Sequence, residues 1–255
     1  MFSRKKPTQK NFNKVCIPSQ SKYLPLQDFN VSGKEITAYF RNIESQLVQH
    51  IQDAEAVVGA VAWLSNSIII QELTEKELVS IVINKNEFNE DLRNEYRKIP
   101  EFQWDFLNEG MLEHLIDDSS ETVKTWEAIR CLGKINSSRM NGKKPLMHHK
   151  FLVFCNLEIW SVSLRDINPD CPENIEDEII DAGSKLEPYA VWTGSFNFSE
   201  NANYSLENAI YITNPDIVSA YYQEWCQLMV LSEPIDYRSP ELSPDWMLSD
   251  RYSDV

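Results

Sequence analysis

The pattern of hydrophobic and polar residues along the chain is typical of an α/β protein. The apolar, Val-rich run at 54–64 predicts a strand buried on both faces, because such a strand has no polar side. A short helix is predicted at 67–77 and a second buried strand at 78–83. A strand, a helix and a strand in so few residues indicate a βαβ unit with parallel strands.

An amphipathic helix is predicted before this unit. Ser32-Gly33-Lys34-Glu35 has the spacing of a capping box, in which the Ser and Glu side chains bond the free N–H groups at a helix start. Apolar residues then recur at helical spacing on one face: Ile36, Phe40, Ile43, Leu47 and Ile51. Ordered structure is therefore expected to begin near residue 32.

The second half of the chain holds further predicted elements. The pattern at 89–117 is helical, and the polar stretch at 134–145 predicts a loop. Apolar segments predict strands at 128–133, 151–155, 189–193 and 208–213. A last helix is expected to begin at Asn214-Pro215, with Ile217, Tyr221, Trp225 and Leu228 on its buried side. Together these elements predict one α/β domain at 32–232, with a mixed, mainly parallel sheet and helices on both faces.

Composition places the chain among soluble globular proteins. Its 255 residues are 42% hydrophobic and 25% charged. A net charge of −15 argues against a protein that coats nucleic acid by bulk electrostatics. The five cysteines include no C-x-x-C pair, which favours a reducing, cytoplasmic location without a disulfide framework or zinc site. The sequence shows neither a signal-peptide pattern nor an apolar run long enough to span a bilayer.

The charge is spread unevenly. Residues 1–31 are expected to form a flexible basic arm, since the first 22 residues contain basic side chains and no acidic one. An acidic insertion is expected at 165–187, as a mobile surface excursion. Residues 233–255 are expected to be an acidic tail that frays beyond Ser232.

Two segments carry residues suited to chemistry. In Met147-His148-His149-Lys150, imidazoles and an ammonium stand at the start of a buried strand. In Thr193-Gly194-Ser195-Phe196-Asn197, a hydroxyl and a carboxamide follow the end of another, and Glu207 comes soon after. In an open α/β sheet such strand ends line the ligand crevice, so we expect the two segments to meet.

Together these segments resemble the phospholipase D superfamily. His148 and Lys150 match its H-x-K motif, Gly194, Ser195 and Asn197 match its G-S-x-N form, and Glu207 falls where the superfamily carries an acid beside the histidine. The strand at 57–64, ending in Ala-Trp-Leu-Ser-Asn, is similar to the opening of single-motif bacterial members. The resemblance covers roughly residues 34–231 and implies a phospholipase D-like fold.

The chain departs from the motif at one position. The superfamily's aspartate would fall at 155, where this chain has Cys155. Since that acid mostly supports the structure in the superfamily, the resemblance implies a buried scaffold position there. The long acidic insertion between the two segments is a second departure.

The resemblance implies hydrolysis of a phosphodiester through a phosphohistidine. One neutral imidazole attacks phosphorus, and a second, protonated imidazole protonates the leaving oxygen. Lys150 and Asn197 hold the phosphate oxygens, Ser195 bonds nearby, and Glu207 orients the histidine ring. No cluster of carboxylates or histidines suggests a metal site, so no metal or other cofactor is expected.

That scheme needs two motifs per site, and this chain has one. Neither His50 nor His114 has a Lys two residues later. The resemblance therefore implies a homodimer with the site on its two-fold axis.

A nuclease acting on DNA or RNA is the expected activity, since small single-motif members are most often nucleases. Four basic residues before the motif are expected to offset the acidic charge and bind nucleic acid: Lys134, Arg139, Lys143 and Lys144. The alternatives are a phospholipid or small-nucleotide phosphodiesterase, or a nucleic-acid-binding module that has lost catalysis. A regulatory protein partner is a further possibility that the sequence leaves open.

Other readings of these residues are structural. His149 alternates with His148 along the strand, so its ring is expected to face the other way. His50 and His114 lie in helical contexts and are interpreted as bystanders. Trp63 is expected in the core with most other tryptophans, while Trp192 is close enough to the motif to line the site. Ser195 lacks the G-x-S-x-G elbow of a serine hydrolase.

Overall fold

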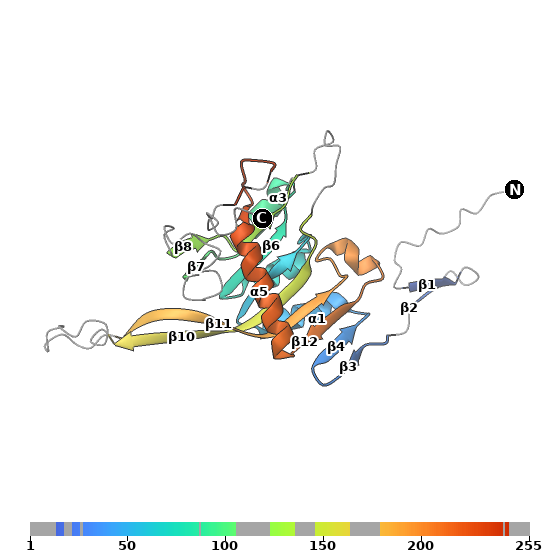
Figure 1. Cartoon of the computed structure of the whole chain (residues 1–255). Helices are drawn as coiled ribbons and strands as arrows, with labels where there is room; N and C mark the ends of the chain where they lie inside the picture. The colour runs from blue at the N-terminus through green and yellow to red at the C-terminus, as the bar shows by residue number, and fades with distance from the viewer. Residues whose placement is uncertain are drawn as a thin grey trace, which may run out of the picture.

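A nine-stranded sheet forms the centre of the molecule (Figure 1). The structure is a computed structural model that describes residues 14–17, 22–25, 28–86, 88–105, 123–135, 146–163, 179–241 and 243–244. The strand order across the sheet is β13-β9-β6-β5-β10-β11-β12-β4-β3. The bounds are β3 (Val31–Ser32), β4 (Ile36–Tyr39), β5 (Ala56–Val61), β6 (Leu78–Asn84), β9 (Ile129–Leu132), β10 (Lys150–Ser163), β11 (Ile179–Gly194), β12 (Ala209–Ile212) and β13 (Glu233–Pro234).

The sheet is mixed but mostly antiparallel. Only the pairs β5–β6 and β6–β9 of this sheet, as far as the structure describes it, are parallel, and its other neighbouring strands pair antiparallel. The expectation of a mainly parallel sheet is therefore wrong, whereas the βαβ unit built from β5, α2 and β6 is confirmed. Parallel neighbours need a crossover connection, and after β9 the chain instead adds each strand beside an antiparallel partner.

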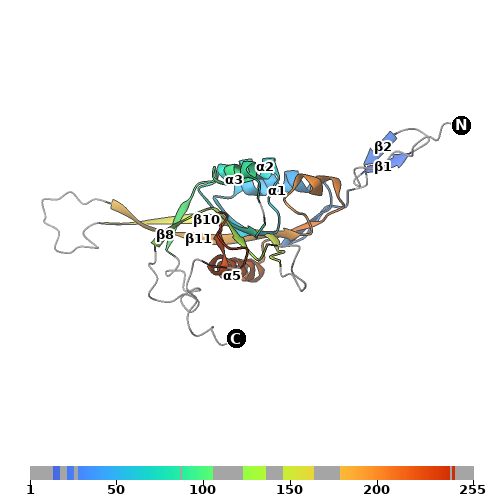
Figure 2. The ribbon, with the colours of Figure 1, turned by 90° about the horizontal axis from the view of Figure 1, so that it is seen from above.

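Helices cover both faces of this sheet, as expected. Figure 2 shows α1 (Ile43–Asp53), α2 (Ser67–Thr74) and α3 (Glu90–Tyr96) on one face and α5 (Pro215–Leu231) on the other. The strands supply a hydrophobic cluster to each side. In β5, Val57 and Val61 join the cluster under α1 and α2, while Val58 and Ala60 join the cluster under α5. A strand buried on both faces is thus apolar at every position, which is the pattern that identified it.

The first helix begins later than the capping-box pattern predicts. Residues 36–39 form β4, which pairs with β12, and α1 starts at Ile43 after Asn42, whose φ is 55°. Leu47 and Ile51 are buried as expected, but Ile36 and Phe40 are exposed. Sheet pairing with β12, a partner remote in sequence, outweighs the local helical pattern here.

The helical pattern at 89–117 is also only partly correct. Helix α3 ends at Tyr96, and β7 (Phe102–Asp105) then pairs with β8 (Val123–Trp126). Pro100 lies between α3 and β7, and a proline disfavours helix at the residue before it. Residues 106–117 lie outside the described part of the chain.

The segments expected to be flexible contain strands. Within 1–31, β1 (Lys14–Ile17) pairs with β2 (Lys22–Pro25). Within the acidic insertion, β11 is already formed from Ile179 and pairs with β10, so that the two project from the sheet as a ribbon (Figure 1). Beyond Ser232 the chain does not fray at once, because β13 pairs with β9 and Ile235 is buried.

The last helix is at its expected place. Asn214 caps it by accepting a hydrogen bond from the Ile217 N–H. Trp225 and Leu228 are buried as predicted, but Ile217 is exposed. Among the described helices, none combines the length and the apolar character needed to cross a membrane.

Candidate active site

Three strand ends meet at one edge of the sheet and bring the two polar segments together. The first residue of β10, Lys150, lies opposite Val61 near the end of β5, and Phe151 lies opposite Thr193 near the end of β11. The Ala62 N–H donates to the His149 carbonyl over 2.8 Å, so β5 and β10 stay bonded up to the motif. The expected meeting of the H-x-K and G-S-x-N segments is what this register produces.

The loops that follow β5 and β11 are bonded to each other. The Phe198 carbonyl accepts the Ser65 and Asn66 N–H groups over 2.7 and 3.0 Å. The Asn66 side chain caps α2 and also donates to the Glu44 carboxylate, which accepts a second hydrogen bond from Asn203. Glu44 of α1 thus links both loops, and hydrogen bonds hold the two loops together at this edge.

Gly194 is required by the close approach of two strands. A Cβ at this position would stand 2.3 Å from the Asn208 carbonyl oxygen and 2.7 Å from the Ala209 Cα, both of them backbone atoms. Directly after it, the Ser195 N–H donates to the Asn208 carbonyl over 3.0 Å, and the Asn208 N–H donates to Ser195 Oγ over 3.1 Å. Gly194 and Ser195 therefore position Asn208, and with it the preceding residue Glu207, beside the end of β11.

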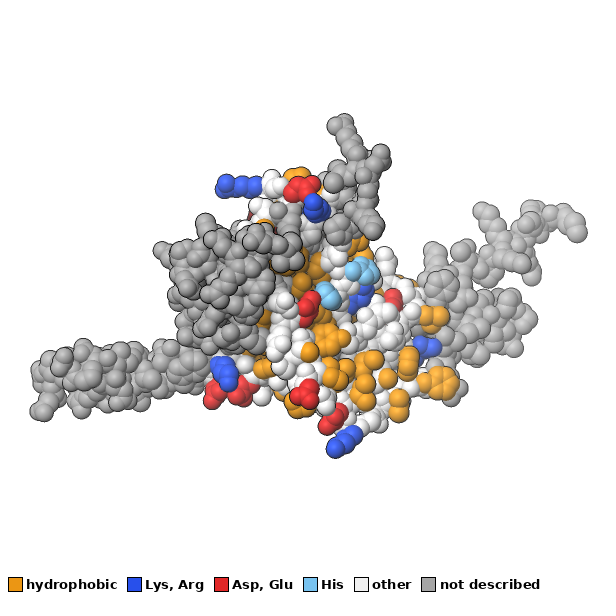
Figure 3. Space-filling model, in the orientation of Figure 1, with side chains coloured by type: hydrophobic (Ala, Val, Ile, Leu, Met, Phe, Trp, Pro, Cys, Tyr) orange, Lys and Arg blue, Asp and Glu red, His pale blue; other side chains and the backbone are white. Residues whose placement is uncertain are grey.

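His148 and Lys150 lie side by side at the surface. Lys150 Nζ is 3.3 Å from His148 Nδ1, 3.4 Å from His148 Nε2 and 3.2 Å from the His148 carbonyl oxygen. Figure 3 shows surface histidine side chains beside a basic one on the face seen in Figure 1. Partial desolvation lowers the pKa of Lys150, and the Glu207 carboxylate acts in the opposite direction. Glu207 is thus close enough for its charge to act on the motif lysine.

Glu207 has a different hydrogen-bond donor from the one expected. Its carboxylate accepts a hydrogen bond from the Ser195 hydroxyl, where the resemblance implied a contact with the His148 ring. Asn197 is half-buried in the same loop, and its Oδ1 has no hydrogen-bond partner within the described residues. This unpaired amide oxygen can accept a hydrogen bond from a ligand, whereas a phosphate oxygen would have to be held by the Nδ2 group of the same carboxamide.

The neighbouring histidine belongs to the other face. His149 Nε2 is 3.3 Å from Glu224 Oε1 on α5, and its ring lies edge-on to Phe151 at 5.6 Å. The prediction that His148 and His149 face opposite sides of the strand is confirmed.

Cys155 lies on that same α5 side. It is 0% exposed and packs in the cluster that also contains Phe151 and Val153. The prediction of a buried position is confirmed. Its side chain is on the face of β10 opposite Leu152 and Phe154, which pack under α1 and α2.

The predicted basic patch is described only at its first member. Lys134 is ion-paired with Glu241, with Nζ 2.5 Å from Oε2, so its charge is already compensated. Arg139, Lys143 and Lys144 lie outside the described residues. A backbone bridge between Gly133 and Leu146 brings the two ends of this segment together beside the motif.

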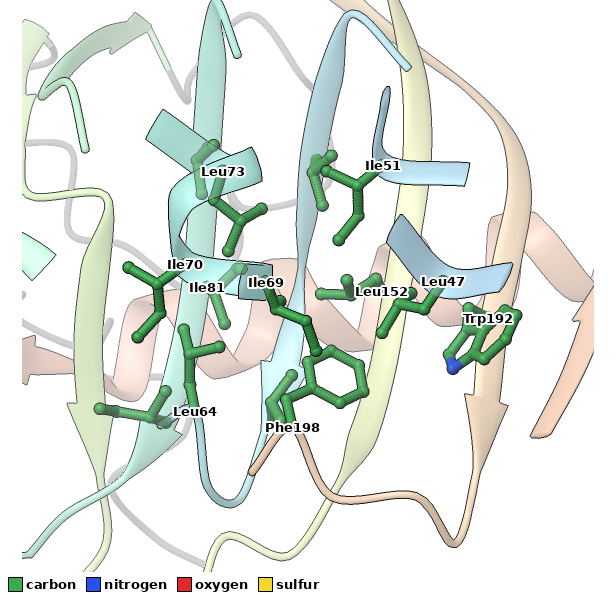
Figure 4. Close-up of a cluster of buried hydrophobic side chains, with 14 of the residues drawn as sticks. Leu47, Ile51, Leu64, Ile69, Ile70, Leu73, Ile81, Leu152, Trp192 and Phe198 are labelled. Carbon is green, nitrogen blue, oxygen red and sulfur yellow. The ribbon is translucent and has the colours of Figure 1, made fainter. Parts of the chain in front are cut away.

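The two tryptophans exchange the roles expected of them. Trp192 is 1% exposed and packs in the core near Leu47 (Figure 4), so it does not line the site. Trp63 is 39% exposed, its ring lies edge-on to His148 at 5.2 Å, and Lys150 Nζ is 5.6 Å from its centroid. Trp63 is the second residue after β5 and lies just before the polar pair Ser65-Asn66, and this position near a strand end was the signal in the sequence for a residue at the site.

His50 is structural, as interpreted. Its ring stacks on Tyr211 with a centroid distance of 3.9 Å, and it shares a hydrogen bond of 3.2 Å with the Tyr39 hydroxyl. Desolvation lowers its pKa, while Asp53 acts in the opposite direction. Among the described residues, no three His, Cys, Asp or Glu side chains gather in a group that could hold a metal ion.

Sequence comparison shows the family of the chain. No protein-family model matches the sequence. The chain is 31% identical over 234 residues to uncharacterized protein L381 of Acanthamoeba polyphaga mimivirus, an alignment that covers 83% of this chain and 71% of that protein. The chain belongs to the same family as this mimivirus protein.

Solved structures were compared as well. NucT from Helicobacter pylori aligns with a TM-score of 0.41 and 13% identity over 76% of this chain and 96% of that chain. Nuc from Salmonella typhimurium aligns with a TM-score of 0.41 and 16% identity over 80% of this chain and 98% of that chain. TrmBL2, an archaeal chromatin protein, aligns with a TM-score of 0.34 and 8% identity over 78% and 55% of the two chains. Nuc is a phospholipase D family member.

Proposed function

We propose that the chain is a phosphodiester hydrolase of the phospholipase D type that cuts nucleic acid. The observation that carries the proposal is the meeting of His148 and Lys150 with the Ser195–Asn197 loop and Glu207 at one edge of the sheet. His148 can supply the nucleophile, and Lys150 with the Asn197 amide can supply the cation and donor for the phosphate oxygens; hydrolysis of a phosphate diester also requires an acid for the leaving oxygen.

In the proposed reaction, the neutral His148 imidazole attacks phosphorus and forms a phosphohistidine, while the leaving oxygen takes a proton from a second imidazole. That second imidazole, now neutral, removes a proton from water, and the resulting hydroxide releases the phosphate from His148. Lys150 and the Asn197 amide hold the non-bridging oxygens, where negative charge is concentrated. Glu207 holds Ser195 in place and favours the charged form of Lys150.

The second imidazole comes from a second copy of the chain. His149 points to α5 and His50 is packed among aromatic rings, so within the described residues His148 is the histidine on the site face. In a dimer with two-fold symmetry, the same residue would arrive from both chains.

Nucleic acid is proposed over a lipid because the motifs resemble those of small single-motif members of the superfamily, which are most often nucleases; the predicted binding residues Arg139, Lys143 and Lys144 lie outside the described residues. A binding module without catalysis is the second candidate, raised by Cys155. Cys155 is buried on the α5 side of β10, whereas Leu152 packs on the opposite side, under α1 and α2. By the alternation of side chains, Lys150 shares the side of Leu152, so replacement of the aspartate by Cys155 is compatible with a retained active site.

Hydrolysis of labelled single- and double-stranded DNA and RNA by the purified protein tests the activity. We expect cleavage that persists in EDTA, since the proposed mechanism uses side chains alone. Activity that disappears with chelator and returns with magnesium or manganese would contradict the phosphohistidine mechanism.

Mixing of chains tests the shared site. When intact and His148→Ala chains are co-expressed in varied ratio, activity should fall roughly as the square of the intact fraction, because each mixed dimer has a defective site. A His149→Ala chain is the matched control and should leave activity nearly proportional to total protein. A linear decline with His148→Ala would show that each chain carries a complete site.

A further inference from the structure

Trp63 is an exposed aromatic residue in direct contact with the motif. It is 39% exposed, whereas Trp126, Trp192 and Trp225 are buried. Its ring meets His148 edge-on at 5.2 Å with an interplanar angle of 85°, and Lys150 Nζ is 5.6 Å from its centroid. The surface of the indole that faces solvent therefore adjoins the place where the phosphate would bind.

The fold does not depend on this ring for the shape of the loop. Ala62 is held by its bond to the His149 carbonyl, and Ser65 and Asn66 are held by the Phe198 carbonyl. The next residue, Leu64, is buried and bridges to Phe198. The backbone on both sides of Trp63 is thus fixed by other contacts, which leaves the indole available for a ligand.

We propose that Trp63 is a stacking platform for a nucleobase of single-stranded nucleic acid, an inference that rests on the proposed phosphodiester site. A phosphate held by His148 and Lys150 brings its attached sugar and base to the ring beside them. Every base has a flat π-face that can stack on an aromatic side chain without regard to sequence. In a duplex those faces are covered by neighbouring base pairs, so the platform favours an unpaired strand.

A choline headgroup is the other ligand chemistry that an exposed indole attracts. Quaternary ammonium groups are bound by cages of several aromatic rings. Here the aromatic contact of Trp63 within the described residues is with His148, and the Lys150 ammonium already lies over the indole. Lys150 would attract the phosphate of either ligand, but it would repel a choline cation at this ring and would not repel a neutral base.

The test separates stacking on the base from binding of the phosphate. Fluorescence anisotropy measures the affinity of the full-length protein for an oligothymidine strand and for an abasic strand of equal length. Phosphorothioate linkages in both strands slow their hydrolysis during the measurement, and cleavage of ordinary strands is followed in parallel. The variants are Trp63→Leu, Trp63→Phe and, as a matched control, Phe29→Ala, which removes a 64% exposed ring near the β3 edge of the sheet.

We expect the intact protein to prefer oligothymidine over the abasic strand and over a duplex of the same length. Trp63→Leu should reduce the preference for bases by about 5- to 150-fold, the equilibrium factor for stacking of one base. Trp63→Phe should retain part of the preference, and Phe29→Ala should retain all of it.

Each other outcome has a distinct meaning. Equal loss of affinity for both strands in Trp63→Leu, or no loss for either, would overturn the stacking role and leave the proposed hydrolase intact. Loss of base preference in a protein that cleaves no strand would support stacking and contradict the hydrolase. Loss of binding to phosphatidylcholine vesicles in Trp63→Leu, with oligonucleotide binding unchanged, would overturn the nucleobase in favour of a lipid headgroup.

Discussion

Two lysines at the same edge of the sheet have opposite surroundings. Lys85 directly follows β6, and Lys150 begins β10. Because β5 is parallel to β6 and antiparallel to β10, the end of β6 and the start of β10 lie at one edge. Both lysines are close to a glutamate, yet only one of them belongs to the candidate active site.

Lys85 is buried and fully bonded. Its Nζ lies 2.7 Å from Glu233 Oε1 and 2.7 Å from the Glu241 carbonyl oxygen, and it stands 4.3 Å from the centroid of the Tyr237 ring. This ammonium ties the C-terminal segment, including β13, to the sheet. It has little capacity left for a ligand.

Lys150 is bonded far less completely. Its contacts with His148 lie between 3.2 and 3.4 Å, and desolvation lowers its pKa in spite of Glu207. A partly desolvated cation without a strong acceptor gains free energy from an anionic ligand. The comparison teaches that the bonding of a charged group, more than its position, separates a structural lysine from a binding one.

A substitution in the candidate active site beside Lys150 should give the largest effect. It should lower activity and leave the free energy of unfolding unchanged. His148→Ala should lower turnover by about 10⁴-fold or more, because it deletes both the nucleophile and the acid of the proposed site. Rates of oligonucleotide hydrolysis and the free energy of unfolding are both measured. The His149→Ala variant should keep most activity, and the reverse result would mean that the two rings have been assigned the wrong way round.

Substitution of the buried Lys85 should instead lower the stability of the fold. Lys85→Ala leaves Glu233 buried without its cation and should lower the free energy of unfolding by about 3–5 kcal/mol, measured by urea denaturation. The double variant Lys85→Met, Glu233→Leu should recover much of this loss, since no buried charge remains. Lys150→Ala is the matched control, expected to change stability little, and equal losses from both lysines would refute the contrast between them.

A smaller effect, on the pH dependence of stability, is expected from His50. This histidine packs against Tyr211 and Tyr39, and it can be compared with the exposed His148. Burial lowers the pKa of His50 from 6.5, so the unfolded chain binds this proton at a higher pH than the folded protein does. Its contribution to stability is therefore complete above pH 6.5 and is lost as the pH falls through the lowered pKa.

Urea denaturation at several pH values measures this contribution. His50→Gln should make the unfolding free energy less dependent on pH below 6.5 than in the intact protein. The exposed His148 supplies the matched variant, His148→Gln, and an equal change in both variants would contradict the assignment to His50.

Much of the site followed from the sequence because its residues are close in the chain. His148 and Lys150 are two residues apart, and the Gly194–Asn197 segment follows a strand that its apolar pattern revealed. The opposite orientation of His149 followed from the alternation of side chains in a strand. The bonding of Glu207 to Ser195, the burial of Trp192 and the exposure of Trp63 depend on loops that meet in space, which no local pattern encodes.

The sequence by itself determined the elements whose pattern is local: the doubly buried strands β5 and β6, the helix between them, and α5 with its Asn214 cap. Only the tertiary structure decided the antiparallel direction of β10, β11 and β12, the conversion of 36–39 into β4, and which of the two lysines has its hydrogen bonds filled within the protein. The physical reason is that side-chain periodicity reports burial within one element. Strand pairing and ion pairing join residues far apart in the chain, as when Glu233 meets Lys85, and their free energy depends on partners that the local sequence does not contain.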